Sequence, residues 1–206
     1  MKVNMAVLGA PRSGKTLFCI NFAQYLGSRI LNYTEESVAG RRRGTLSPAA
    51  AREMMVFNGQ RGRGVVRTFA VHLLRQPCKR IALIDTASLK EGVPLPYLER
   101  SRLLLTLQAL ESAVMVLQMI DLSCNDPARL EFDEKVGRFL AAYCRRRDKL
   151  FLTAGSKADL IGDSSGRERI TASGRILYIS SLTQAGFPRL HSDILDRAVL
   201  SSSQNH

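Results

Sequence analysis

Residues 9–16 read Gly9-Ala10-Pro11-Arg12-Ser13-Gly14-Lys15-Thr16, and they decide the fold because they fit the pattern G-x-x-x-x-G-K-[ST]. An apolar run, Val3–Leu8, precedes this octapeptide, and a helix-like run follows it and ends before Gly27. A tight turn between a strand and a helix directs backbone amides and the positive helix N-terminus at an anion. The pattern fixes only four positions, but the strand and helix around it are the context that the motif requires. We therefore expect a phosphate-binding loop.

In such a loop each kind of residue has its own task. The backbone from Gly9 to Leu17 surrounds the phosphates, and Gly14 allows the turn. Lys15 reaches the β- and γ-phosphates, and the hydroxyl of Thr16 ligates Mg²⁺. The sequence thus predicts a nucleotide site that uses Mg²⁺.

A second loop predicts which base is bound. Thr153-Ala154-Gly155-Ser156-Lys157-Ala158-Asp159-Leu160 follows the apolar run Leu150–Thr153. The Asp159 carboxylate can accept hydrogen bonds from N1-H and the exocyclic amine of guanine, whereas adenine has an acceptor at N1 and lacks that amine. A buried carboxylate without these partners costs about 1 to 3 kcal/mol, so guanine is favoured. Lys157 is expected to cover the base with its methylenes. The alternative is a solvated loop that only ends the strand.

With these two loops, the chain resembles the translation-factor-related class of small GTP-binding domains, and it is most similar to the bacterial Era, EngA and TrmE group. The resemblance covers residues 3–200. Asp85-Thr86-Ala87-Ser88-Leu89 is similar to the D-T-A-G element of that class, which implies that Asp85 reaches Mg²⁺ through water and that the Ser88 amide approaches the γ-phosphate. Ser180-Ser181-Leu182 stands where the class has an S-A-K loop, whose amides contact the guanine O6. Gly64-Val65-Val66-Arg67 is similar to a G-T-T-R signature.

The resemblance implies an α/β fold, the three-layer P-loop NTPase fold of Ras-like G domains, with GTP or GDP as ligand. The pattern of apolar runs independently predicts a mostly parallel six-stranded sheet with one antiparallel edge strand. Strands are expected at Val3–Leu8, Val65–Leu74, Lys79–Ile84, Ala113–Ile120, Leu150–Thr153 and Ile176–Ile179. Helices are expected at Thr16–Leu26, Pro96–Ser112, Pro127–Arg147 and Pro188–Leu200. The link Gln76-Pro77-Cys78 is too short for a crossover helix, so the second and third strands should form an antiparallel hairpin.

Several residues depart from the pattern of the class. Ser88 replaces a glycine and restricts the turn. Leu89 stands where Ras-type proteins have the glutamine that orients the attacking water, so unassisted hydrolysis should be slow. Arg12 replaces an asparagine; its guanidinium either lies beside the α- and γ-phosphates or points outward.

The switch threonine that closes over Mg²⁺ has no obvious counterpart. Val65 and Val66 occupy its position, and valine cannot ligate a metal. Thr45 is a candidate ligand and Thr34 a second one. The remaining interpretation is a degenerate switch that closes poorly.

Residues 35–64 carry many of the chain's basic side chains. This segment is expected to be an enlarged switch region forming a mobile cationic lid, with a short amphipathic helix at Ala49–Phe57, although it can also be a loop that charge merely keeps solvated. The formal net charge of +12 favours polyanionic partners, for which RNA or the ribosome, an acidic protein and an anionic membrane surface are the candidates. No RNA-reading module is recognisable.

The chain has no transmembrane segment or secretory peptide in its sequence pattern, and its four cysteines form no C-x-x-C pair, which indicates a cytoplasmic protein. We expect one domain, residues 1–200, followed by a disordered tail at 201–206.

Two classes of function follow. The first is a slow GTP hydrolase acting as a switch, in which Lys15, Thr16 and Asp85 neutralise developing charge and a partner or a second copy in a homodimer assists. The second is a pseudo-GTPase, an interaction module with little or no turnover. An ATP-using small-molecule kinase is a third interpretation, and Asp159 argues against it.

Overall fold

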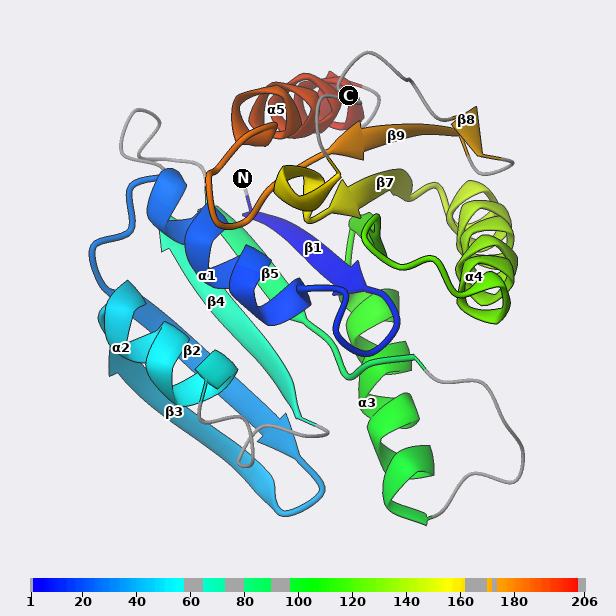
Figure 1. Cartoon of the computed structure of the whole chain (residues 1–206). Helices are drawn as coiled ribbons and strands as arrows, with labels where there is room; N and C mark the ends of the chain where they lie inside the picture. The colour runs from blue at the N-terminus through cyan, green and yellow to red at the C-terminus, as the bar shows by residue number, and fades with distance from the viewer. Residues whose placement is uncertain are drawn as a thin grey trace.

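The computed structural model describes residues 2–57, 65–72, 80–89, 97–161, 170–171 and 174–203. Within these residues the chain forms one mixed sheet of nine strands in the order β3-β2-β4-β5-β1-β6-β7-β9-β8 (Figure 1). The strands are β1 (Lys2–Leu8), β2 (Leu31–Ser37), β3 (Gly40–Leu46), β4 (Val66–His72), β5 (Arg80–Asp85), β6 (Met115–Asp121), β7 (Leu150–Ser156), β8 (Ile170–Thr171) and β9 (Gly174–Tyr178). The helices are α1 (Lys15–Tyr25), α2 (Pro48–Arg52), π-helix η1 (Glu53–Phe57), α3 (Tyr97–Ser112), α4 (Pro127–Arg146), 3₁₀-helix η2 (Ala158–Leu160) and α5 (Phe187–Ser203).

The centre of the sheet is parallel, and helices cover both of its faces. Strands β5, β1, β6, β7 and β9 pair in parallel, each with its neighbour. One face packs on α1 and α5, where Phe18, Phe22, Phe187 and Ile194 are fully buried. The other face packs on α3 and α4 through Leu110 and Leu140 and their neighbours. The expected three-layer α/β fold is confirmed.

Parallel strands all end at the same edge, and this brings the predicted loops together. The phosphate loop follows β1, Asp85 ends β5, and the Lys157 loop follows β7. In α/β sheets ligands bind beyond the carboxyl ends of the strands. The fold therefore collects the predicted loops at the edge where a ligand is expected.

The antiparallel hairpin expected from the short link is present, because β4 pairs antiparallel with β5. The linking residues 73–79, with Cys78, lie outside the described part of the chain. The antiparallel strand β4 was expected at the edge of the sheet. That expectation is wrong, because β2 and β3 continue the sheet beyond β4. Six of the nine strands correspond to the expected ones, and β2, β3 and β8 are additional.

The segment at residues 35–64 is not a lid throughout. Residues 31–46 form a hairpin, visible in Figure 1 at the outer edge of the sheet, in which Glu35 lies opposite Arg42 and Glu36 opposite Arg41. Pairing with β4 holds this polar hairpin in place, a contribution that its own pattern does not reveal. Residues 58–64, with Arg61 and Arg63, lie outside the described residues.

The short helix expected at Ala49–Phe57 is present as α2 followed by η1. Ser47 caps it, since its hydroxyl accepts a hydrogen bond from the amide of Ala50 at 3.2 Å. The tail expected to be disordered from residue 201 is helical at first, because α5 continues to Ser203.

Among the described residues, no helix is long and apolar enough to span a membrane.

Candidate functional site

The phosphate loop has backbone conformations that its sequence requires. A Cβ atom at Gly9 would lie 2.4 Å from the backbone oxygen of Met119 on β6, so only glycine fits. Gly14 is left-handed, with φ of +84°, and starts α1. Arg12 also has a positive φ of +63°, which costs energy for a residue with a side chain. The loop is therefore held in one curved form by the strand behind it.

Lys15 lies inside this loop. Its Nζ atom donates to the carbonyl oxygens of Gly9 and Ala10, each at 2.9 Å, and to the hydroxyl of Ser88 at 3.1 Å. Burial lowers the pKa of Lys15 to about 8, although the nearby Asp85 carboxylate acts in the opposite direction. The ammonium group is thus poorly compensated, and an anion in the loop would supply the missing charge.

Thr16 and Asp85 meet beside Lys15. The Thr16 hydroxyl donates to Oδ2 of Asp85 at 2.8 Å. Asp85 is 3% exposed, and burial raises its pKa, against which the Thr16 hydrogen bond, Lys15 and Arg67 act. Its other oxygen, Oδ1, is buried and has no hydrogen-bond partner among the described residues. A hydroxyl and an orphaned carboxylate oxygen are the ligands that Mg²⁺ takes, directly or through water, so the residues fit this ion.

A cavity of about 690 Å³ opens next to this pair. Eight of the predicted nucleotide-binding residues and the expected switch position line it: Pro11, Arg12, Gly14, Lys15, Thr16, Leu17, Asp85, Ser88 and Val65. Leu89 lines it too. The rest of its wall comes from residues that the sequence analysis did not assign to the site, among them Met55 and Val56 of η1, Arg67 of β4 and Thr106 of α3.

The structure places Arg12 and Leu89 at this cavity in different ways. Arg12 is exposed at the phosphate loop, and which of its two expected orientations a ligand would select stays a prediction. Leu89 is half-buried, and its amide donates to the carbonyl of Gly9 at 3.1 Å. The segment after Asp85 is thereby joined to the phosphate loop.

Thr45 is not brought to the site. It lies on β3, the outermost strand, and its hydroxyl donates to Oδ1 of Asn32 at 3.1 Å. Thr34 lies on β2, opposite Arg43 of β3. Neither threonine lines the cavity, so the expected role of Thr45 as a metal ligand is not supported in this arrangement. The reason is that Thr45 belongs to β3, which pairs with β2 over its whole length and is thereby held at the edge of the sheet.

Side-chain hydrogen bonds hold the start of the predicted base-binding loop. Lys157 adopts a left-handed conformation, with φ of +58°, and its Nζ donates to Oδ2 of Asp121 at 2.5 Å. The hydroxyl of Ser156 donates to the carbonyl of Ile120 at 3.0 Å. Asp121, for which no ligand role was expected, therefore holds Lys157 in position. Asp159 and Leu160 are both exposed, Leu160 to 64%, so both lie beyond this anchored part.

The loop after β9 is joined to the predicted base-binding loop and to α1. The Ala158 amide donates to the carbonyl of Ile179 at 3.1 Å, which ties the base loop to residues 180–182. Asn21 on α1 donates to the carbonyl of Ser181 at 2.5 Å. Ser180 and Ser181 are buried, whereas Leu182 is exposed. None of the residues predicted to contact the base lines the 690 Å³ cavity.

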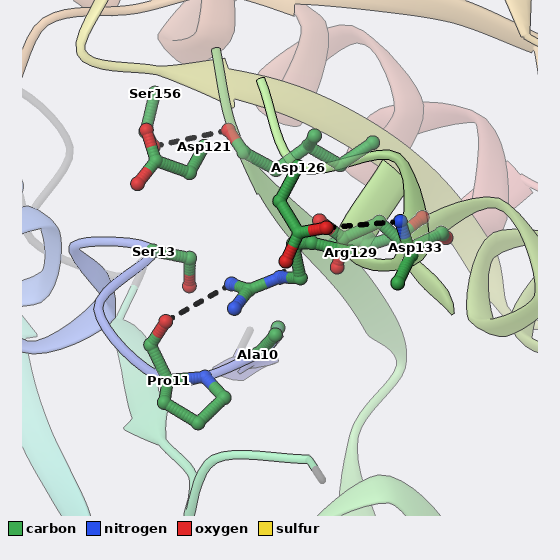
Figure 2. A network of polar contacts seen from close by, with 12 residues as sticks. Ala10, Pro11, Ser13, Asp121, Asp126, Arg129, Asp133 and Ser156 are labelled. Atoms are coloured by element: carbon green, nitrogen blue, oxygen red, sulfur yellow. Dashed lines mark hydrogen bonds and ion pairs between the residues drawn. The ribbon is translucent and has the colours of Figure 1, made fainter. Parts of the chain in front are cut away.

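A polar network that sequence reasoning missed supports the phosphate loop from behind (Figure 2). Arg129 of α4 donates to the carbonyl of Pro11 at 2.9 Å and to Oδ2 of Asp133 at 3.2 Å. Asp133 is 3% exposed, and its backbone carbonyl accepts from Gln118 at 2.7 Å. The i, i+4 spacing of Arg129 and Asp133 was a readable signal, but the contact with Pro11 was not.

Comparisons with known proteins give the fold. No protein-family model matches the sequence, and no curated protein matches it either. Among solved structures, a variant of Era from Aquifex aeolicus bound to GDP·AlF₄⁻ is similar with a TM-score of 0.54 at 17% identity, over 95% of this chain and 56% of that one. SsGBP in complex with GDP has a TM-score of 0.61 at 15% identity, over 97% and 51% of the two chains. The apo cytosolic domain of the FeoB iron transporter from T. maritima has a TM-score of 0.58 at 14% identity, over 96% and 64%.

The chain thus has the fold of P-loop G domains such as those of Era and FeoB, and it spans just over half the length of the Era chain that it matches. At these identities the likeness concerns the fold. The residues described above must carry any statement on function.

Proposed function

We propose that this chain binds GTP and GDP together with Mg²⁺. The observation that carries the proposal is the group formed by Lys15, Thr16 and Asp85: an under-compensated ammonium inside a loop of backbone amides, next to a hydroxyl and an orphaned carboxylate oxygen. Lys15 would hold the β- and γ-phosphates, and Thr16 and Asp85 would hold the ion, which supplies charge neutralisation to the phosphates when bound.

Guanine preference is attributed to Asp159. The anchored Lys157 and the hydrogen bond from the Ala158 amide to Ile179 hold the two residues directly before Asp159, so the Asp159 carboxylate is presented from a fixed base. A carboxylate accepts from both guanine donors, and adenine leaves it unpaired. That Era and SsGBP were crystallised with guanine nucleotides agrees with this choice.

Hydrolysis, in this proposal, is slow and needs help from outside the chain. Leu89 lines the cavity where a water-positioning side chain would act, and it has neither donor nor acceptor. Thr45 and Thr34 lie on the edge hairpin, away from the cavity. A partner protein or a second copy of the chain would supply the missing group; without one, the chain holds its nucleotide as an interaction module.

A second function, binding to RNA or the ribosome, is favoured by the basic hairpin. Arg42 and Arg43 are exposed on β3, at the open edge of the sheet. A structure of Era is a complex with MgGDPNP and nucleotides of 16S ribosomal RNA, with a TM-score of 0.56 at 18% identity. The net charge of +12 would draw this chain to the same kind of polyanion.

The base assignment is tested with Asp159→Asn. An amide donates where the carboxylate accepted, so this variant should lose affinity for GDP and gain affinity for xanthosine diphosphate. Equilibrium titration with fluorescent analogues of both nucleotides measures the change. Asp148→Asn is a matched control, since Asp148 is exposed between α4 and the start of β7, at the opposite end of that strand from the Lys157 loop. An unchanged nucleotide preference in Asp159→Asn would remove this residue from the base site.

A further inference from the structure

Arg67 is the most unusual buried side chain of the cavity wall. It is 4% exposed in a strand whose neighbours on the same face, Phe69 and Val71, belong to the apolar core. A buried guanidinium requires compensating charge, because its desolvation is costly. Its two acidic partners are Glu35 on β2 and Asp85 on β5.

The sheet register explains why these three residues meet. Glu35 is the cross-strand partner of Arg67, and Arg67 is the cross-strand partner of Asp85. Direct cross-strand partners point to the same face of a sheet with their Cβ atoms close together. The Arg67 Nε atom donates to Oε2 of Glu35 at 2.8 Å, and its Nη1 atom lies 3.9 Å from Oδ2 of Asp85. The row continues outward to Arg42, the partner of Glu35 on β3.

The distances show where the guanidinium is held. The contact with Glu35 is a short hydrogen bond, whereas the contact with Asp85 is a longer electrostatic one. Glu35 thus holds Arg67 beside Asp85, but Arg67 donates no hydrogen bond to the Asp85 carboxylate. Oδ1 of Asp85 has no hydrogen-bond partner among the described residues. Arg67, Thr16 and Asp85 all line the cavity. Its positive charge lies where it acts on anything bound at Asp85.

We propose that Arg67 is an internal cation that partly takes the place of the divalent ion at Asp85, and that Glu35 sets how strongly it does so. This inference rests on the proposed nucleotide function and adds a specificity-determining residue to it. With no metal bound, Arg67 balances the Asp85 charge and supports a bound phosphate chain. With a metal bound, the metal ion and the Arg67 guanidinium repel each other, and the ion pair with Glu35 stabilises the guanidinium.

The proposal predicts opposite effects of two substitutions that leave the strands intact. Arg67→Gln removes the competing cation, so the divalent ion should bind more tightly. Glu35→Gln leaves Arg67 with Asp85 as its only acidic partner, so the ion should bind more weakly. Two unit charges about 4 Å apart interact by about 1 kcal/mol in water and by about 4 kcal/mol near a protein surface, so each substitution should change the affinity by about five-fold or more. A purely structural role of the pair would move both variants in the same direction.

The experiment uses Mn²⁺ as a probe, titrated into the nucleotide-free full chain and followed by electron paramagnetic resonance. In parallel, fluorescent GDP is titrated in Mg²⁺ and in EDTA. Controls are Arg41→Gln and Glu36→Gln, which change the same charges on the adjoining exposed ion pair. Circular dichroism confirms that each variant is folded.

The expected result is a lower Mn²⁺ dissociation constant for Arg67→Gln, a higher one for Glu35→Gln, and control variants that match the parent. In EDTA, Arg67→Gln should also lose GDP affinity. Shifts in one direction only, equal shifts in the controls, or no Mn²⁺ binding at all would overturn the role of Arg67. One further outcome is that the two variants shift Mn²⁺ binding in the two predicted directions while the parent binds no guanine nucleotide. In that case the proposed function fails and the role of Arg67 stands.

Discussion

The buried Lys15 makes a quantitative prediction for the stability of the nucleotide-free chain. Burial lowers the pKa of Lys15 from 10.5 to about 8. Between these two pH values the unfolded chain binds the Lys15 proton and the folded chain does not. The free energy of unfolding therefore rises with pH across this window, because stability increases wherever the unfolded state binds more protons. With about 1.4 kcal/mol for each pH unit, the rise that Lys15 contributes is about 3 kcal/mol.

The perturbation that isolates this contribution is Lys15→Met, which keeps an unbranched side chain of nearly the same length and removes its charge. Urea unfolding of parent and variant, followed by circular dichroism at several pH values from 7 to 10.5, gives the difference in unfolding free energy. Other titrating groups are shared by the two proteins and cancel in the difference. The parent should gain about 3 kcal/mol relative to the variant as the pH rises through the window.

Two results would refute the reasoning. If the two stability curves run parallel with pH, the Lys15 pKa is not lowered and the ammonium is well compensated in the empty loop. If the parent loses stability relative to the variant as the pH rises, the Lys15 pKa is raised instead. Either result removes the argument that the loop lacks an anion.

The remaining predictions concern the support of the phosphate loop. Gly9→Ala places a Cβ 2.4 Å from a backbone oxygen of Met119 and should lower the unfolding free energy by about 1 to 3 kcal/mol, seen as a lower Tm. Gly40→Ala, at a positive φ but with nothing within 4 Å, is the matched control and should cost less; equal losses would mean that backbone strain alone decides. Arg129→Gln leaves Asp133 as a buried, unpaired charge and should destabilise the chain by about 3 kcal/mol in urea unfolding. Adding Asp133→Asn should restore part of that loss, and a further, additive loss in the double variant would contradict the pairing.

The sequence was sufficient for the parts of the fold that local pattern determines. The phosphate loop, its strand and its helix follow from glycines and a lysine at fixed spacing, and the structure confirms that arrangement. The central strands are apolar runs that only a sheet covered on both faces can bury. Asp126-Pro127 correctly predicts the start of α4 by a cap and a first-turn proline.

The hairpin at residues 31–46 could not be predicted in the same way. Its strands are polar, and their backbone hydrogen bonds depend on β4, which comes later in the chain. The expected metal ligand Thr45 was misplaced for this reason. β8 is only two residues long and gives no periodic signal.

The polar side chains that complete the site were missed because their partners are distant in sequence. Arg67 was noticed only as part of a signature, since nothing near it predicts Glu35 and Asp85 as its neighbours. Arg129 likewise contacts Pro11 across the fold. Local spacing predicts elements, whereas contacts of this kind depend on the strand order.

The measurement that tests the account most directly is equilibrium binding of GDP, GTP, ADP and ATP to the purified chain in the presence of Mg²⁺, by isothermal titration calorimetry. The account predicts that guanine nucleotides bind at least about ten-fold more tightly than adenine nucleotides, and that Lys15→Ala abolishes the binding of both. Equal affinity for the two bases, or guanine binding that survives in Lys15→Ala, would contradict it.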